Sequence, residues 1–135
     1  MDIFVPGTHG STFGGNPLAA AVATEALNLL VEDQLPERSM ELGSYLMAEL
    51  RALTSPLISE VRGKGLFIGV EIDTALGSAR EVCERLMERG LLSKETHETV
   101  VRLAPPLVVT KEDLDWAITQ IREVLEEMDE VRLAS

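Results

Sequence analysis

Apolar residues recur at intervals of three and four in two stretches of the N-terminal half, and each stretch predicts a helix. The first, over about residues 17–32, is apolar on nearly every side, which is typical of a helix buried within a larger body of protein. The second covers about residues 36–53. Its apolar stripe consists of Met40, Gly43, Met47, Leu50 and Leu53.

Two further helices are predicted in the C-terminal half. A short one begins after Ser78, whose hydroxyl can cap it, and ends just before Gly90, a residue suited to a left-handed C-terminal turn. The last begins after Thr110, which an acidic residue follows at the third position, and is expected to fray from about Asp129. Its apolar stripe consists of Leu114, Ala117, Ile118, Ile121, Leu125 and Met128.

Short apolar stretches elsewhere predict strands. Residues 57–72 fit two strands joined at the Gly63-Lys64-Gly65 bend, because glycine is typical of such turns. Residues 91–93 and 100–104 fit one more strand each, and two prolines stop the second of these. Strands this short, with a hairpin among them, favour an α+β fold, in which a small, mostly antiparallel sheet has helices packed on one face.

The composition narrows the class of protein. The 135 residues include 12 Lys and Arg against 23 Asp and Glu, so the formal net charge is −11. An acidic surface repels nucleic-acid phosphates and anionic lipid head groups, and we therefore expect no nucleic-acid and no membrane partner. The one cysteine, Cys83, is expected in the core and fits a reducing compartment. Without a long apolar run or a signal pattern, a cytoplasmic location is expected.

Residues 6–17 predict a shaped loop, because glycine and proline make up half of them. The hydroxyls of Ser11 and Thr12, the glycine amides around them and the helix start at Asn16-Pro17 can together bind an anion, most naturally a phosphate. A tight turn whose hydroxyls only cap the helix would use the same residues. Both interpretations stand on the sequence.

Arg102 is the second candidate for a binding residue. It lies in a predicted strand shortly before Pro105, and its planar guanidinium can hold a carboxylate through two parallel hydrogen bonds. At a strand end beside a rigid turn, such a group can bind a substrate carboxylate. The alternative is an exposed strand arginine that pairs with a surface glutamate.

The lysines and histidines do not predict a nucleophile or a metal site. The three lysines, Lys64, Lys94 and Lys111, lie in polar surroundings that keep an amine protonated, so none is expected to act as a nucleophile. His9 and His97 come with no third ligand at metal spacing, so no metal site is predicted. His97 itself is expected in a polar loop that lines a site.

Three segments resemble class-III pyridoxal-phosphate aminotransferases, in the same order along the chain. Gly-Thr-His-Gly-Ser-Thr-Phe-Gly-Gly-Asn-Pro, residues 7–17, is similar to the segment that follows the cofactor lysine in that family. Val-Arg-Gly-Lys-Gly-Leu at 61–66 resembles the hairpin of its small domain, and Val-Arg-Leu-Ala-Pro-Pro-Leu at 101–107 its substrate-arginine segment. The resemblance implies the C-terminal small domain of a fold-type-I aminotransferase, with residues 1–17 as a cofactor-phosphate and dimer-interface loop and 18–135 as the domain itself.

The resemblance also implies roles for three residues. Ser11 and Thr12 would donate to the phosphate of pyridoxal 5'-phosphate across a homodimer interface, and Arg102 would clamp a substrate carboxylate. In the family, the cofactor lysine lies upstream of the Gly-Ser-Thr loop, on the large catalytic domain. This chain would therefore supply no catalytic residue and be inactive alone, with the large domain of the same polypeptide and a second subunit as its partners.

Residues 91–107 are most similar to the ornithine branch of the family, through Lys-Glu-Thr-His at 94–97. This similarity implies transfer of the δ-amino group of ornithine to a 2-oxo acid, 2-oxoglutarate, with glutamate semialdehyde and glutamate as products. Acetylornithine and 4-aminobutyrate aminotransferases share the arginine segment more loosely and remain alternatives. A different class of protein, a non-catalytic dimerisation or binding module with the helix at 17–31 as its interface, is the other alternative.

Overall fold

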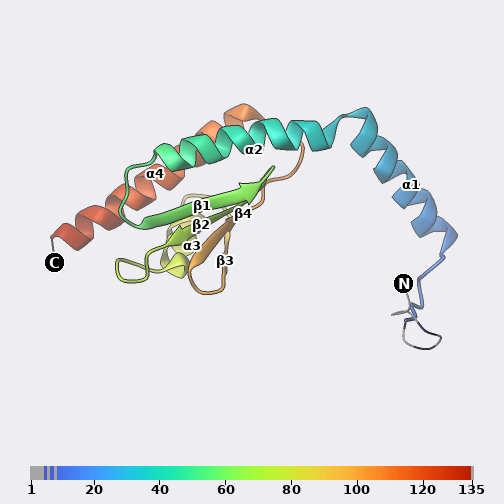
Figure 1. The fold of residues 1–135 in the computed structure, drawn as a ribbon, viewed down its shortest axis with the longest axis horizontal. Coiled ribbons are helices and arrows are strands. Elements are labelled where there is room, and N and C mark those ends of the chain that lie inside the picture. The colour runs from blue at the N-terminus through green and yellow to red at the C-terminus, as the bar shows by residue number, and fades with distance from the viewer. Residues whose placement is uncertain (1–4, 6, 8, 135) are drawn as a thin grey trace. The chain divides into compact units, whose positions relative to one another are not determined.

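The computed structural model describes residues 5, 7 and 9–134, which form two compact units, Met1–Leu35 and Pro36–Ser135 (Figure 1). Residues 1–4, 6 and 8 of the predicted loop, and residue 135, lie outside the described residues. The expected division of the chain after residue 17 concerns the intact protein and stays a prediction.

The first unit contains one helix, α1 (Pro17–Glu32), with the bounds that the sequence predicts. Asn16 caps it as expected, because its side-chain oxygen accepts from the amides of Leu18 at 2.9 Å and Ala19 at 3.3 Å. Pro17 occupies the first turn, where its missing amide costs no hydrogen bond. Although the helix is apolar nearly all round, it buries no residue within this chain. Its apolar surface is of the kind that further protein covers.

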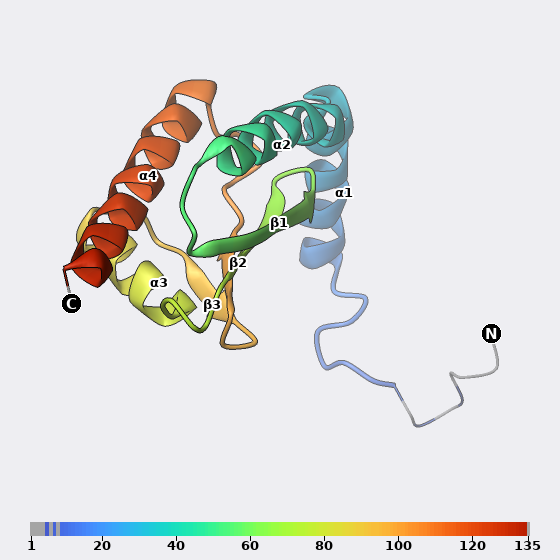
Figure 2. The same cartoon turned by 60° about the vertical axis from the view of Figure 1, so that its left-hand side comes forward.

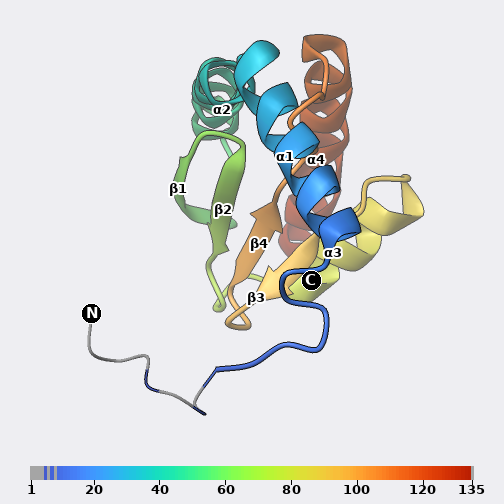
Figure 3. The same ribbon diagram turned by 90° about the vertical axis from the view of Figure 1, so that its right-hand side faces the viewer.

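The second unit combines an antiparallel sheet with three helices. In chain order its elements are α2 (Leu35–Ala52), β1 (Ile58–Lys64), β2 (Phe67–Ile72), α3 (Ala79–Glu88), β3 (Lys94–Thr96), β4 (Val100–Leu103) and α4 (Lys111–Leu133). The strand order is β1-β2-β4-β3, and every neighbouring pair is antiparallel. Figures 2 and 3 show α3 and α4 on the same side of this sheet. The predicted α+β fold is confirmed.

Alternation along the strands gives the sheet one buried face and one open face. In β2, Ile68, Val70 and Ile72 are buried, whereas the residues between them are at least partly exposed. Val101 and Leu103 of β4 join the same core, which α2, α3 and α4 complete. The largest fully buried side chains are Leu50, Leu57, Ile68, Leu86 and Val124. The opposite face of the sheet carries polar side chains together with the apolar Phe67 of β2 and Val100 of β4.

Three details of the sequence prediction are wrong. Residues 91–93 form no strand, because the amide of Leu91 closes the end of α3 by donating to Leu86 O at 2.9 Å, and the strand β3 starts only at Lys94. Met40, assigned to the apolar stripe, is 47% exposed, and Leu46, which the predicted stripe lacks, joins the correctly predicted Leu50 in the core.

The third error concerns the chain end, since α4 continues to Leu133 instead of fraying from Asp129. Asp129 accepts a hydrogen bond from Ser55 Oγ at 2.8 Å and pairs with Arg132 at 3.3 Å. These contacts tie the last turns to the loop that follows α2. The ordered C-terminal end thus has a local physical cause.

The expected caps of α3 and α4 are present. Ser78 Oγ accepts from the Glu81 amide at 3.1 Å, and Gly90 has a left-handed φ of 87°. At α4, Thr110 Oγ1 accepts from the Asp113 amide at 3.1 Å, while the Asp113 carboxylate accepts from the Thr110 amide at 3.2 Å. The Thr110 hydroxyl also bonds that carboxylate, and this hydroxyl is the largest cause that lowers the pKa of Asp113.

We expect Thr110→Ala to lower the free energy of unfolding by about 1 kcal/mol, because it removes the cap of the longest helix described. The pKa of Asp113 is lowered in the folded state, so the separate contribution of its charged carboxylate is present above the ordinary carboxyl pKa and is lost as pH falls through the lowered one. Urea unfolding at neutral and acid pH measures both effects. Thr119→Ala, within the same helix, is the control. A Thr110→Ala effect no larger than the control's would contradict the role of the cap.

Candidate functional site

Three cations lie in one row across the open face of the sheet. Arg62 of β1 faces Gly69 of β2, Gly69 faces Arg102 of β4, and Arg102 faces Lys94 of β3. Residues that face one another in an antiparallel sheet project to the same side, so all three cationic side chains leave the open face. Gly69 stands between the two arginines without a side chain, and a Cβ there would approach Val100 Cγ1 to 3.0 Å.

Arg102 lines a cavity of about 400 Å³ on this face, together with Arg62, Gly69, Thr96 and His97. The side chain of Arg102 is exposed. Among the described residues, none forms a hydrogen bond or ion pair with its guanidinium, so the expected alternative of a pair with a surface glutamate is absent there. An unpaired guanidinium in a cavity is suited to bind a carboxylate or another planar anion.

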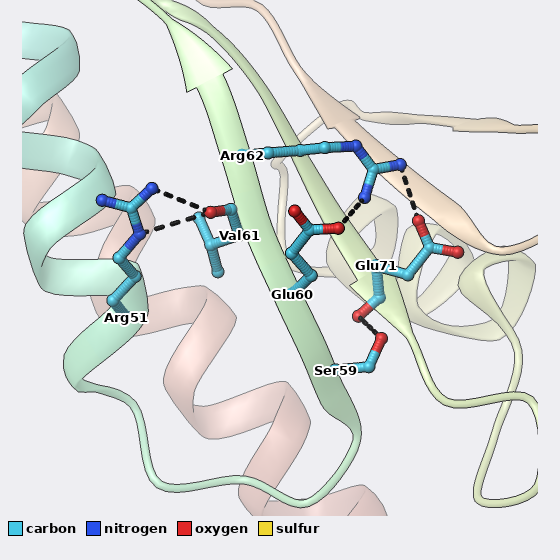
Figure 4. A network of polar contacts seen from close by, with 6 residues as sticks. All are labelled: Arg51, Ser59, Glu60, Val61, Arg62 and Glu71. Carbon is cyan, nitrogen blue, oxygen red and sulfur yellow. Dashed lines mark hydrogen bonds and ion pairs between the residues drawn. The ribbon is translucent and has the colours of Figure 1, made fainter.

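Arg62, by contrast, is fully engaged. It donates to Glu60 Oε2 at 2.7 Å and to Glu71 Oε2 at 2.6 Å, as Figure 4 shows. The bond to Glu71 is the largest cause that raises the pKa of Arg62. In turn, a hydrogen bond from Thr99 and then the bond from Arg62 lower the pKa of Glu71, so that this carboxylate is charged at neutral pH.

Arg51 of α2 is hydrogen-bonded to β1, the edge strand that carries Arg62. Its Nε and Nη2 donate to the backbone oxygen of Val61 at 3.2 and 3.0 Å (Figure 4). Ser59 Oγ donates across the hairpin to Glu71 O at 3.2 Å. These bonds satisfy backbone acceptors near the sheet edge, so β1 holds Arg62 at a defined position.

His97 lies at the rim of the same cavity, in the turn between β3 and β4. It and Glu98 have left-handed φ values of 53° and 68°, which non-glycine residues adopt only at a cost. The expected loop position of His97 is confirmed, whereas its place in a functional site stays a prediction. Among the described residues, no group of three His, Cys, Asp or Glu is placed to hold a metal ion.

Ser11 and Thr12 belong to the first unit, in the turn that leads into α1. Both are exposed, and the amide of Gly14 donates to Ser11 O at 3.2 Å. A Cβ on Gly14 would lie 3.2 Å from Ser11 Cβ, so the turn is tight around the serine. Two exposed hydroxyls on a turn beside a helix N-terminus fit the phosphate group that the resemblance implies. The residues also fit the simpler interpretation of a turn.

The other reactive side chains show no arrangement for chemistry: one lysine is ion-paired, two are exposed and the cysteine is buried. Lys111 donates to both carboxylate oxygens of Asp115, at 3.1 and 2.9 Å, and these bonds raise its pKa. Lys64 ends β1 and is exposed, as is Lys94. Cys83 is buried as expected, and burial is the main cause that raises the pKa of its thiol. No helix in the described part of the chain is both long and apolar enough to cross a bilayer.

The sequence indicated Arg102 as a candidate, and the structure places it in the cavity, but the ion pair of Arg62 and Glu71 was not predicted. A signal was present, since Glu60 and Arg62 are two residues apart and so share a face of β1. The position of Glu71 relative to them depends on the register of the hairpin, which shifts between Ile58 and Glu60.

The model of the aminotransferase class-III family matches residues 1–125. The chain belongs to this family. Among members of the class-III aminotransferases, the ornithine aminotransferase of Geobacillus sp. (strain WCH70) is 60% identical over 124 residues, which are 92% of this chain and 30% of the relative. The ornithine aminotransferase of Bacillus subtilis is 59% identical over 125 residues, which are 93% of this chain and 30% of the relative.

Solved structures of class-III aminotransferases also resemble this fold. The ornithine aminotransferase of Toxoplasma gondii superposes with a TM-score of 0.87 at 44% identity, over 98% of this chain and 32% of that one. The acetylornithine aminotransferase of Elizabethkingia anophelis gives a TM-score of 0.82 at 44% identity, over 94% of this chain and 34% of that one. The chain thus spans about a third of the length of the relatives it matches.

Proposed function

We propose that this chain is the small-domain part of a pyridoxal-phosphate-dependent ornithine aminotransferase. The observation that carries the proposal is the unpaired Arg102 in the cavity on the open sheet face, at the place where the family resemblance puts a substrate-binding arginine. Its planar fork suits the carboxylate of 2-oxoglutarate or glutamate. The sequence identity of 56% to 61% to relatives named ornithine aminotransferase supports ornithine as the amino donor.

Ser11 and Thr12 have the second role in this proposal. Their hydroxyls would donate to the phosphate of pyridoxal 5'-phosphate bound by the other subunit of a homodimer, and the helix N-terminus at Asn16 adds a favourable dipole. The cofactor, when bound, supplies the electron sink for amino transfer. The solved structure of the similar ornithine aminotransferase of Toxoplasma gondii has partial occupancy of pyridoxal phosphate at its active site, which supports the same cofactor here.

The proposal assigns the catalytic lysine to a large domain of the same polypeptide, because none of Lys64, Lys94 and Lys111 is suited to hold the cofactor. Lys111 is bonded to Asp115, and the other two are exposed. A large domain would also cover the apolar surface of α1. The 135 residues alone are then inactive, and the intact homodimer acts in the cytoplasm.

Ornithine-dependent formation of glutamate semialdehyde tests the proposal. With pyridoxal phosphate and 2-oxoglutarate present, we expect turnover by the intact protein that carries this chain and none by the 135 residues alone. Acetylornithine is assayed in parallel, since one structural relative is named for that substrate. Strong turnover of acetylornithine and none of ornithine would contradict the substrate assignment. Activity of the 135 residues alone would contradict the assignment of the catalytic lysine to another domain.

A further inference from the structure

The turn between β3 and β4 holds two consecutive residues in an unfavourable backbone conformation. His97 and Glu98 have φ values of 53° and 68°, in the left-handed region that glycine and asparagine adopt more readily. The one other described non-glycine residue with a positive φ, Gln34, directly follows the C-cap of α1, where this conformation is common. Glycine would form the turn between β3 and β4 at less cost, so the local fold alone does not require a histidine there.

Contacts with the neighbouring strands impose this conformation on the turn. The amide of Ile72 donates to Thr99 O at 2.8 Å, and the Thr99 side chain bonds the Glu71 carboxylate. The pairing of Thr96 with Val100 closes the turn from the other side. Strain that the surroundings maintain in this way is typical of places where a side chain has to be presented to a ligand.

Of the two strained residues, His97 lines the cavity that contains Arg102, whereas Glu98 does not. No residue that the structure describes forms a hydrogen bond with the His97 ring. The nearby acidic group is Glu71, and a hydroxyl and a guanidinium already bond its carboxylate. The imidazole of His97 is therefore available to a molecule in the cavity.

A second donor beside Arg102 suits a carboxylate ligand. The two oxygens of a carboxylate have about four positions that accept hydrogen bonds, and the fork of an arginine fills only two of them. An imidazole carries at least one N–H in every tautomer and in its charged form. Since His97 and Arg102 line the same cavity, one small ligand there can contact both.

We propose that His97 is a further ligand-binding residue, whose imidazole donates a hydrogen bond to the carboxylate that Arg102 holds. The inference rests on the proposed function, because it takes Arg102 as the carboxylate-binding residue. It gives a role to the Lys-Glu-Thr-His stretch at 94–97, which the proposed function leaves without one. It also explains why a histidine occupies a position at which glycine would be less strained.

Two glycine variants of the intact protein that carries this chain separate a binding role from a structural one. Glycine relieves the left-handed strain at either position, so we expect neither His97→Gly nor Glu98→Gly to lower the thermal midpoint of unfolding. We expect His97→Gly to raise KM for 2-oxoglutarate about 5- to 20-fold, with kcat changed less than about twofold, because a donor to the bound ligand is lost. Glu98→Gly is the matched control. It makes the turn equally flexible but removes no side chain from the cavity, and leaves KM unchanged.

Three results of this comparison overturn the proposal. The first is an unchanged KM in His97→Gly. The second is an equal rise of KM in Glu98→Gly, because flexibility of the turn would then be the cause. The third is a thermal midpoint that falls further in His97→Gly than in Glu98→Gly, because the imidazole would then stabilise the turn instead of binding a ligand.

Inhibition by glutarate measures binding of a ligand that does not react. Glutarate has the two carboxylates of 2-oxoglutarate but lacks the oxo group that accepts the nitrogen. We expect His97→Gly to raise the inhibition constant of glutarate by about the same factor as KM for 2-oxoglutarate. A raised KM with an unchanged inhibition constant would place the effect of His97 at the oxo group, and would overturn the proposed contact with the carboxylate.

Arg102→Gln separates this inference from the proposed function. If Arg102→Gln raises KM strongly and His97→Gly leaves it unchanged, the binding role of His97 alone is wrong. If Arg102→Gln itself leaves KM unchanged, the carboxylate-binding role of Arg102 fails, and the inference fails with it.

Discussion

Replacing Arg102 by glutamine is expected to lower kcat/KM for 2-oxoglutarate about 10- to 100-fold in the intact protein that carries this chain. Hydrogen bonds to a charged group contribute about 1.5–3 kcal/mol, and glutamine keeps the polarity of the side chain but loses the charge and the two-pronged geometry. Because no described residue binds the guanidinium of Arg102, its removal breaks no ion pair there and leaves stability nearly unchanged. Steady-state kinetics together with thermal unfolding measure both effects.

Arg102→Lys refines this experiment. Lysine keeps the charge but cannot form two parallel bonds, so we expect its kcat/KM to lie between those of the wild type and the glutamine variant. Arg80→Gln, which removes an exposed guanidinium of α3 bonded to Glu84, serves as the surface control. The carboxylate-binding role would be wrong if Arg102→Gln changed kcat/KM no more than Arg80→Gln did. It would also be wrong if the whole loss in Arg102→Gln followed from unfolding.

Much of the fold could be predicted because its helices carry their own end signals. Asn16 with Pro17, and Thr110 with its acidic partner at the third position, set the starts of α1 and α4 through hydrogen bonds between near neighbours. The strand at 91–93 was predicted wrongly because its two apolar residues do not pair with a neighbouring strand. The amide of Leu91 ends α3 and its side chain packs on the core, while Leu92 is 83% exposed. The strand forms instead at Lys94–Thr96, where the backbone pairs with β4.

The candidate site divides in the same way. Arg102 could be named as a candidate from the sequence, because its position near the end of a strand is a local feature of the chain. The pair of Arg62 and Glu71 could not be found, because it joins two strands whose register is irregular between Ile58 and Glu60. A shift by one residue would place Glu71 on the other face of the sheet. Contacts that depend on register need the folded sheet.

Gly43 is the position where a single methyl group is expected to cost the most stability. It is buried in α2, and a Cβ there would lie 2.1 Å from the backbone carbon and oxygen of Gly65, in the turn between β1 and β2. Ser39, one turn earlier in α2, accepts from the Leu66 amide at 3.1 Å on the same turn. The helix and the hairpin therefore touch through their backbones, and neither side has a flexible side chain to move aside.

We expect Gly43→Ala to lower the free energy of unfolding by about 3 kcal/mol or more, because overpacking against backbone displaces the hairpin as a whole. Urea unfolding measures this loss. Gly90→Ala is the matched control, since its Cβ would meet nothing within 4 Å and only its left-handed φ of 87° is strained, at about 1 kcal/mol. An equal or smaller loss in Gly43→Ala than in Gly90→Ala would contradict the close approach of α2 to the hairpin. Since that hairpin carries Arg62 and Glu71, partial loss of the approach would also disturb the open face of the sheet.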